Sequence, residues 1–219
     1  ALPIWVIGHK KRADAYTWIQ KQIETLGTQT FIICPLIEDS ENFSEVKAVK
    51  SEYEHLQHIF PTLKLGLIHG KLSASDKTSV LQQFRNQEYN ILVATQVVEV
   101  GIDIPNATII VIEGAERFGL GQLHQLRGRV GRSEKPSYCL LFTTSEDGET
   151  ISRLKAMETL YDGAELAEVD MKLRGPGDIL GNRQHGASSM KIASYMDISA
   201  VTNTYDAVKE LTQSDPDLV

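Results

Sequence analysis

Residues 90–112 read Asn-Ile-Leu-Val-Ala-Thr-Gln-Val-Val-Glu-Val-Gly-Ile-Asp-Ile-Pro-Asn-Ala-Thr-Ile-Ile-Val-Ile, two apolar runs on either side of a mixed segment. The runs at 90–94 and 108–112 are short, rich in Ile, Leu and Val, and do not alternate between apolar and polar residues. Such runs are typical of strands that a parallel sheet buries on both faces. We therefore predict two buried strands of a parallel sheet here.

The rest of the first 145 residues alternates β-rich runs with amphipathic stretches, as expected when helices cover both faces of such a sheet. Further strands are predicted at 3–8, 30–34, 64–68 and 137–143. Helices are predicted at 12–26, at 40–60 and after Ser73, which would be an N-cap. The stripe that would bury the first helix consists of Ala15, Trp18, Ile19, Ile23 and Leu26. The predicted fold class is α/β, a three-layer domain with a mainly parallel sheet.

Beyond Thr144 the pattern becomes helical. Segments 149–160 and 164–173 are predicted as two short helices that form a small hairpin. A glycine-rich stretch follows at 174–186, and its embedded Arg174, Arg183 and Gln184 are more than a mere linker needs. C-terminal helices are predicted within 190–211. The predicted division is 1–145, 146–190 and 191–219.

Composition narrows the class of protein. The 219 residues are 42% hydrophobic and 23% charged, enough for one α/β core with a smaller appendage. The net charge of −7 argues against a wholly basic nucleic-acid coat, so DNA contacts would need local patches such as 9–12 and 127–132. Cys34 and Cys139 lie in apolar runs, which favours buried reduced thiols and a cytoplasmic protein. No apolar run approaches the length of a membrane span, and no metal site is predicted.

Residues 122–132 read Gln-Leu-His-Gln-Leu-Arg-Gly-Arg-Val-Gly-Arg. A guanidinium group presents a planar fork suited to phosphate, while glycine lets the backbone approach a ligand closely. Arg129 and Arg132, flanked by Gly128 and Gly131, are therefore candidates for a polyphosphate clamp. An exposed basic helix end is the structural alternative.

Two loops that follow strands are further candidates. His69 and Gly70 come directly after the strand at 64–68, where backbone amides at the start of a helix could meet a nucleic-acid phosphate. An ordinary strand-to-helix turn explains that loop equally well. The loop at 95–105 places Thr95, Glu99 and Asp103 in an otherwise apolar run, which a purely structural segment has no reason to do.

The segments 95–105 and 122–132 resemble motifs V and VI of superfamily 2 helicases. The motif VI consensus Gln-x-x-Gly-Arg-x-Gly-Arg is matched without a gap by Gln125, Gly128, Arg129, Gly131 and Arg132. This resemblance implies a RecA-like fold. It also implies that the two arginines stabilise charge on the γ-phosphoryl group of ATP, with Gln125 and Gly128 beside the nucleotide.

By the same resemblance, motif V would place Gly101 and Asp103 against the nucleotide and Thr95 on the DNA backbone. His69 and Gly70 are assigned to DNA because of their place at the start of a helix. Glu99 remains open between a motif role and a capping or salt-bridged carboxylate.

Within that superfamily the chain resembles the RecG type. The stretch Cys34-Pro-Leu-Ile-Glu-Asp-Ser-Glu41 and the Gly-Pro-Gly form of the glycine-rich stretch favour it over the transcription-repair coupling factor, for which Gly-Ala-Gly is expected. The resemblance implies that Arg153, Arg174 and Gln184 form a network that couples the glycine-rich loop to the ATP state. The alternative for Arg174 is a cap on the preceding helix.

What this resemblance implies for the intact protein is an ATP-dependent DNA helicase, monomeric and cytoplasmic in a bacterium, that acts on branched or forked DNA in recombination and repair. The cofactors would be ATP and Mg²⁺. No phosphate loop, Asp-Glu box or wedge domain occurs here, so the Mg²⁺ ligands and the N-terminal RecA-like and wedge domains would precede Ala1. The fragment alone is then expected to be inactive. A non-catalytic nucleic-acid-binding or scaffold module is the alternative of a different class.

Overall fold

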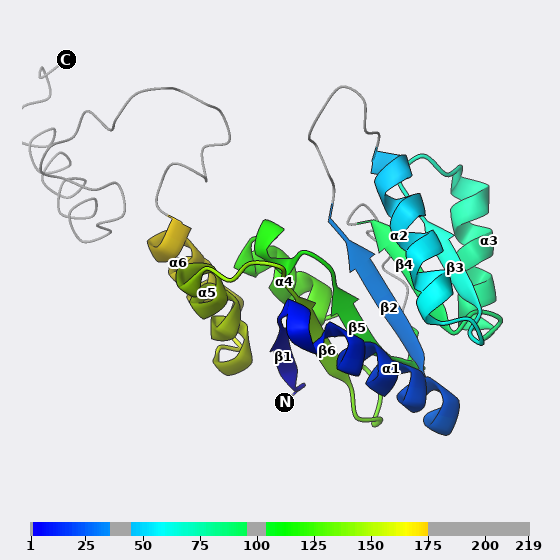
Figure 1. The fold of residues 1–219 in the computed structure, drawn as a ribbon, viewed down its shortest axis with the longest axis horizontal. Coiled ribbons are helices and arrows are strands. Elements are labelled where there is room, and N and C mark those ends of the chain that lie inside the picture. Colours follow the sequence, from blue (N-terminus) through cyan, green and yellow to red (C-terminus); the bar gives the residue numbers. More distant parts are fainter. Residues whose placement is uncertain (1, 36–44, 96–103, 175–219) are drawn as a thin grey trace, which may run out of the picture. The chain divides into compact units, whose positions relative to one another are not determined.

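The computed structural model describes residues 2–35, 45–95 and 104–174. At its centre lies a six-stranded sheet in the order β1-β6-β5-β2-β4-β3, and all neighbouring strands are parallel (Figure 1). The strands are β1 (Ile4–Ile7), β2 (Gln29–Cys34), β3 (Leu65–Ile68), β4 (Ile91–Thr95), β5 (Ala107–Ile112) and β6 (Tyr138–Phe142). The predicted α/β class with a parallel sheet is confirmed.

Six α-helices and two short 3₁₀ helices accompany the sheet in the described ranges. They are η1 (His9–Lys11), α1 (Arg12–Leu26), α2 (Glu45–Ile59), α3 (Ala74–Arg85), η2 (Ala115–Arg117), α4 (Leu120–Arg127), α5 (Gly148–Thr159) and α6 (Gly163–Arg174). Local signals set several ends. Gly27 closes α1 in the left-handed conformation with φ +61°, and Ser73 caps α3 by accepting a hydrogen bond from the Asp76 amide. The sequence did not predict α4 as a helix.

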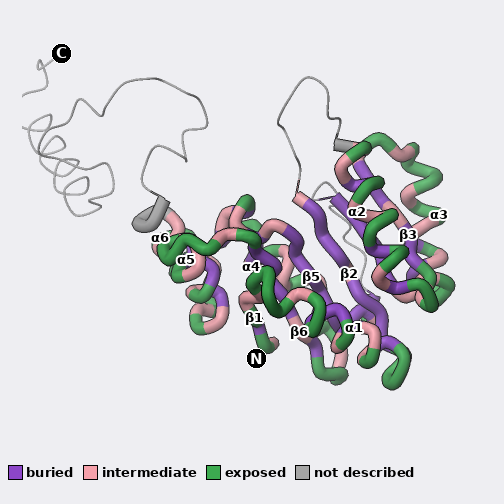
Figure 2. Tube along the Cα trace, in the orientation of Figure 1, coloured by how far each residue is buried: buried purple, intermediate pink, exposed green. Residues whose placement is uncertain are grey.

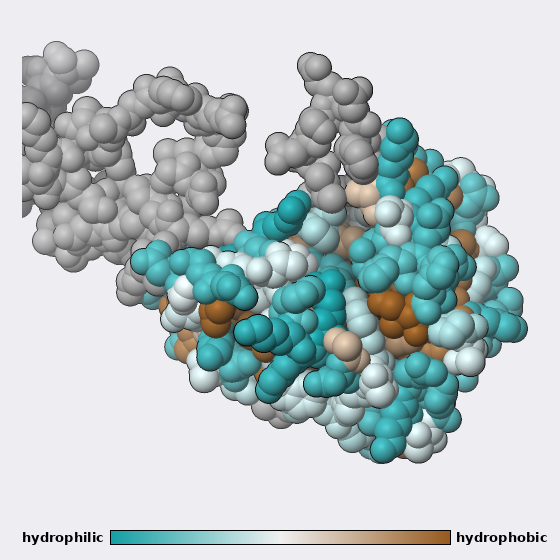
Figure 3. Space-filling view, in the orientation of Figure 1, coloured by the Kyte–Doolittle hydropathy of each residue, from teal (hydrophilic) through white to brown (hydrophobic). Residues whose placement is uncertain are grey.

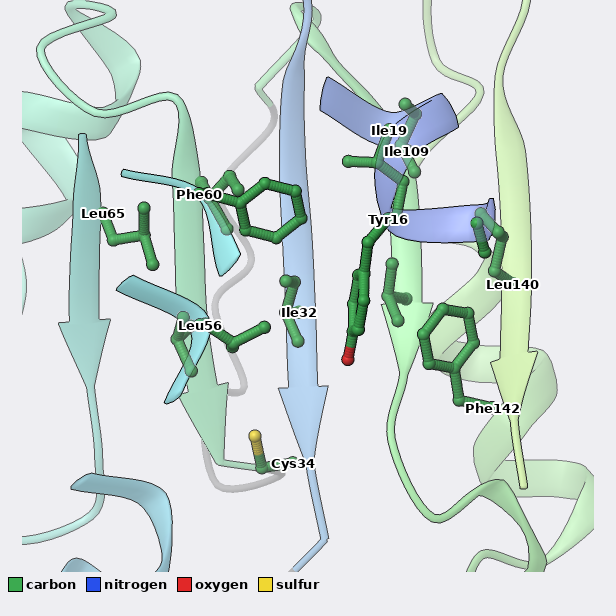
Figure 4. Packing of buried hydrophobic residues seen from close by; sticks show 14 of the residues in the cluster. Tyr16, Ile19, Ile32, Cys34, Leu56, Phe60, Leu65, Ile109, Leu140 and Phe142 are labelled. Carbon is green, nitrogen blue, oxygen red and sulfur yellow. The ribbon is translucent and has the colours of Figure 1, made fainter. Parts of the chain in front are cut away.

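Both faces of the sheet are buried, as the purple strands of Figure 2 show. On one face α1 packs through Tyr16 and Ile19, and α2 through Leu56 with Phe60 just after it, onto alternate strand residues (Figure 4). On the other face Phe84 of α3 meets Phe31 of β2, with ring centroids 5.2 Å apart. Because every central strand is covered twice, its apolar runs are continuous.

The predicted stripe of α1 is correct except at its end. Ala15, Ile19 and Ile23 are buried, and Trp18 packs against the core from a partly buried position. Leu26 is 60% exposed, because the helix stops there and the chain turns away at Gly27. Helical spacing alone could not show this.

The edge strand β1 is covered by α5. Glu158 of α5 accepts a hydrogen bond from the Val6 amide at 3.1 Å, a backbone donor that an edge strand would otherwise leave to solvent. Leu154 and Met157 of the same helix are fully buried. The chain divides into two compact units, 1–167 and 168–219, and α6 continues into the second. The domain boundaries given above stay predictions, and the glycine-rich stretch and the C-terminal helices lie outside the described residues.

Both cysteines are buried and unoxidised, as predicted. Burial raises the pKa of Cys139 to about 12 and that of Cys34 further still. These thiols are therefore core side chains without nucleophilic character. Within the described ranges, no helix combines the length and apolar character needed to cross a bilayer.

Candidate nucleotide and nucleic-acid sites

The two candidate loops and the stretch that begins at Cys34 start side by side at the carboxyl edge of the sheet. Thr95 pairs with Cys34 of β2, and Ala94 pairs with Ile68 of β3, so His69 leaves the sheet next to Thr95. Open α/β sheets bind ligands at this edge. The structure thus brings the first residues of these three segments together, while residues 36–44 and 96–103 lie outside the described part.

Thr95 and His69 are both buried in this row. Thr95 is 1% exposed, and its hydroxyl has no hydrogen-bond partner among the described residues. His69 is 7% exposed, so a contact with DNA from this position would come through its backbone. The Gly70 carbonyl accepts a hydrogen bond from Lys77 Nζ at 3.0 Å. The loop is an ordered strand-to-helix turn that leads to the capped start of α3.

The arginine-rich stretch forms α4 and the loop after it. Leu120 and Leu123 anchor α4 in the core, and the Gly119 amide donates to Gln122 Oε1 at its start. The helix ends at Arg127, and the Gly128 amide donates to the His124 carbonyl. We call residues 128–132 the arginine loop. The arginines therefore do lie at the end of a helix, as the structural alternative to a polyphosphate clamp had it. This local fold does not decide what they bind.

Contacts within the arginine loop and with the core fix the course of its backbone. Val130 is buried, and Arg132 donates from Nε to the Gly128 carbonyl at 3.1 Å. Gly131 has φ +80°, and a Cβ atom there would lie 3.0 Å from Leu2 Cδ1. A side chain at this position would be strained and crowded. Arg132 is exposed and Arg129 partly exposed, so the loop presents guanidinium groups from a fixed backbone.

The arginine loop lies away from the row formed by Thr95 and His69. Gly131 neighbours Leu2 and Ser137, which precede β1 and β6 and so mark the amino ends of these strands. Beyond the loop, Lys135 Nζ donates to Asn106 Oδ1 at 2.7 Å. The segment after the arginine loop is thereby joined to the segment that follows loop 96–103.

Of the other residues that are predicted to bind the nucleotide, the structure describes only Gln125 and Gly128. Gln125 is exposed on α4, and Gly128 is exposed at its end. Gly101 and Asp103 lie outside the described residues, as does Glu99. Their roles remain predictions.

Arg153, predicted as a coupling residue, is buried between α5 and the segment before α4. Its guanidinium donates to the Phe118 carbonyl at 3.0 Å and to the Glu116 carbonyl at 2.8 Å. Arg174 is the last residue of α6, but its side chain is not described, and Gln184 lies outside the described residues. The structure therefore shows what Arg153 binds, at η2 and the residue after it, and the network of the three residues stays a prediction.

One basic patch is smaller than the sequence suggested. Within His9–Arg12, the Arg12 guanidinium is paired with Glu113, so only His9, Lys10 and Lys11 remain fully exposed. The face drawn in Figure 3 is mostly hydrophilic, with small apolar patches. The Arg12–Glu113 pair could not be predicted from local sequence patterns, because the two residues belong to distant segments.

The sequence patterns assign no role to Arg127. In the structure it contacts the turn between α5 and α6. A histidine three residues earlier on the same helix face is the local signal that could have suggested a pair.

Comparison with known proteins agrees with this description. Residues 14–134 match the model of the helicase conserved C-terminal domain. The chain is 44% identical over 97% of its length to the ATP-dependent DNA helicase RecG of Synechocystis, and 47% identical over 86% to that of Staphylococcus aureus. It spans 26% and 28% of these relatives.

Among solved structures, RecG bound to a three-way DNA junction matches 96% of this chain and 25% of its own, with 38% identity and a TM-score of 0.70. Domain 2 of the DEAD-box helicase Mss116p, bound to an RNA duplex, matches 74% of this chain and 62% of its own, with 24% identity and a TM-score of 0.56, a likeness of fold. The RecA-like fold and the resemblance to RecG are confirmed. The chain belongs to the family of helicase conserved C-terminal domains.

Proposed function

We propose that this chain is the second RecA-like motor domain and the coupling segment of an ATP-dependent DNA helicase of the RecG type. The observation that carries the proposal is the arginine loop, in which an exposed Arg132 is fixed to the Gly128 carbonyl at 3.1 Å directly after a helix that Leu120 and Leu123 anchor in the core. The loop has the full motif VI pattern. A scaffold module would have no need for guanidinium groups held in this way.

The arginine loop acts on ATP held mainly by a preceding motor domain. When the two domains close, Arg129 and Arg132 stabilise the charge on the γ-phosphoryl group as it leaves, a role worth about 1000-fold or more in rate. Gln125, Gly128, Gly101 and Asp103 face the nucleotide. No cluster of three metal-binding side chains occurs in the described ranges, and the Mg²⁺ ligands belong to the preceding domain.

The row at the carboxyl edge acts on DNA. Thr95, His69 and Gly70 leave neighbouring strands there, and the buried hydroxyl of Thr95, which has no partner among the described residues, would bind the DNA backbone. The substrate is branched DNA, such as a stalled fork or a Holliday junction. The similarity to a RecG that was solved with a three-way junction supports this choice.

Arg153, Arg174 and Gln184 transmit the ATP state to the glycine-rich loop. The intact protein is a monomer of the bacterial cytoplasm, and its partners within the same chain are an N-terminal RecA-like domain and a wedge domain. Its role lies in recombination and repair.

The test uses the intact enzyme. Arg132→Ala should lower DNA-stimulated ATP hydrolysis by orders of magnitude and leave DNA affinity nearly unchanged, because the lost contact is made mainly in the transition state. Arg132→Lys should not restore activity, since a point charge cannot reproduce the planar fork. Arg85→Ala, an exposed arginine on α3, is the matched control. Loss of DNA binding with normal hydrolysis in Arg132→Ala would instead assign the loop to the DNA backbone.

A further inference from the structure

Arg127, at the end of α4, binds the turn that joins α5 to α6. Its Nη2 donates to the Tyr161 carbonyl at 3.1 Å and its Nη1 to the Leu160 carbonyl at 3.4 Å. The guanidinium carbon also lies 5.6 Å from the centre of the Tyr161 ring. One side chain thus binds the carbonyl of the C-cap residue of α5, the next carbonyl of the turn, and the ring beside them.

His124, one helical turn earlier on α4, accepts a further hydrogen bond from Arg127. Arg127 Nη2 lies 2.8 Å from His124 Nδ1, and a guanidinium can only donate, so Nδ1 is the acceptor and carries no proton. On its other side the ring faces the start of α6: a Cβ atom on Gly163 would lie 3.4 Å from His124 Nε2. We call this arrangement of His124, Arg127 and the turn 160–163 the turn clamp.

The turn clamp adjoins the arginine loop directly. Only Gly128 separates Arg127 from Arg129, and the loop continues to Arg132. The other end of α4 is also bound to α5, because Arg153 holds the Phe118 and Glu116 carbonyls that precede the helix. The helix α4 is therefore fastened to α5 at both ends. A shift of the arginine loop must either move the α5–α6 turn with it or break the clamp, since packed elements switch between discrete arrangements.

We infer that Arg127 is a positioning residue, which passes the movement of the arginine loop to the α5–α6 turn and so to the DNA-moving segment beyond it. This inference rests on the proposed function. It assigns Arg127 neither to ATP nor to DNA. A residue that merely capped α5 would affect folding alone, whereas a positioning residue affects how much unwinding each hydrolysed ATP produces.

The experiment measures fork unwinding and DNA-stimulated ATP hydrolysis in the intact enzyme, with the melting temperature of each variant. In Arg127→Ala the ratio of unwinding to hydrolysis should fall at least about fivefold. Fivefold is about the smallest effect that ordinary coupling between two sites produces. Hydrolysis itself should remain, because Arg129 and Arg132 are untouched. Arg127→Lys should be impaired as well, since an ammonium group cannot span both carbonyls and the ring. It also serves as the second variant if Arg127→Ala does not fold.

Lys155→Ala is the matched control, because it removes an exposed cation from α5 outside the clamp. Its ratio should equal that of the unmodified enzyme. An unchanged ratio in both Arg127 variants would overturn the inference, as would a fall that simply follows the melting temperature. Failure of the proposed function would look different: Arg132→Ala would then hydrolyse ATP normally, whatever the Arg127 variants did.

Discussion

Arg12, which is partly exposed, and the buried Glu113 form an ion pair, with Arg12 Nη2 2.8 Å from Glu113 Oε2. The pair joins the first residue of α1 to the residue that follows β5. Tyr16 donates its hydroxyl hydrogen to the second carboxylate oxygen at 2.9 Å. Burial raises the pKa of Glu113, and the charge of Arg12 offsets part of this effect. The carboxylate thus depends on one nearby cation.

Replacing that cation should destabilise the protein. We expect Arg12→Met to lower the free energy of unfolding at neutral pH by about 3 kcal/mol, because it leaves a buried carboxylate without its counter-charge. The folded-state pKa of Glu113 then rises further above its unfolded value. Stability is lost as pH rises through that raised pKa, so the deficit should shrink as pH falls towards the ordinary glutamate range. Urea unfolding at neutral and mildly acidic pH measures both quantities.

The matched control for this pair is the double variant Arg12→Met with Glu113→Gln. It removes the charge as well as its partner and should be more stable than Arg12→Met alone at neutral pH. If the deficit of Arg12→Met is the same at both pH values, Glu113 is not the group responsible.

A second prediction concerns Gly66 in β3. A Cβ atom at this position would lie 2.8 Å from Tyr89 Cδ2, so Gly66→Ala must displace a ring that packs on the strand. We expect a loss of about 1–3 kcal/mol, the usual cost of overpacking. Gly121→Ala in α4 is the contrasting control: its Cβ meets nothing within 4 Å, so it should gain up to about 1 kcal/mol from helix propensity. Equal melting temperatures for the two variants would contradict the steric argument.

How far the sequence predicts this molecule depends on how local each signal is. The ends of α1 and α3 were predictable because Gly27 and Ser73 act within a few residues, and the strands because their apolar runs are continuous. The helix α4 was not predicted. It has only 8 residues, of which Leu120 and Leu123 are buried, and it is bounded by Gly119 and Gly128, so its helical pattern is short and weak.

For the candidate site too, local features could be predicted and long-range contacts could not. Its residue types followed from motif patterns in short stretches, whereas the surroundings of those residues did not. The grip of Arg127 on Tyr161 and the placement of Arg153 on Phe118 join segments that are far apart in the chain. No periodicity encodes such contacts, because they arise only when α5 folds back along β1.

A third prediction concerns the chain by itself. Purified residues 1–219 should fold but show no appreciable ATPase activity and only weak nucleotide affinity, because they supply the arginine loop without a phosphate-binding loop. Circular dichroism would report folding, and phosphate release with and without DNA would report hydrolysis. Robust hydrolysis stimulated by DNA would mean that the catalytic parts are misassigned.

The last prediction concerns the pH dependence of the turn clamp. Partial burial and the charge of Arg127 lower the pKa of His124, while Asp162 opposes them. A histidine whose pKa is lowered in the folded state takes up its proton at a lower pH than it does in the unfolded chain. Stability is therefore unaffected above about pH 6.5, the unperturbed value, and falls as pH drops below it. Protonation also turns Nδ1 into a donor, which breaks its hydrogen bond with Arg127.

In the intact enzyme the ratio of unwinding to hydrolysis should therefore be constant above about pH 6.5 and decline as pH falls below it, because the lowered pKa keeps His124 neutral at higher pH. His124→Gln should flatten this decline, because an amide oxygen can accept from Arg127 above and below that pH. The variant should retain most of the coupling at the upper pH, where His124 is neutral in both states. A His124→Gln enzyme whose ratio declines with the same profile as the unmodified enzyme would show that another group titrates, and the clamp would then lose its part in the pH response while the Arg127 contacts stand.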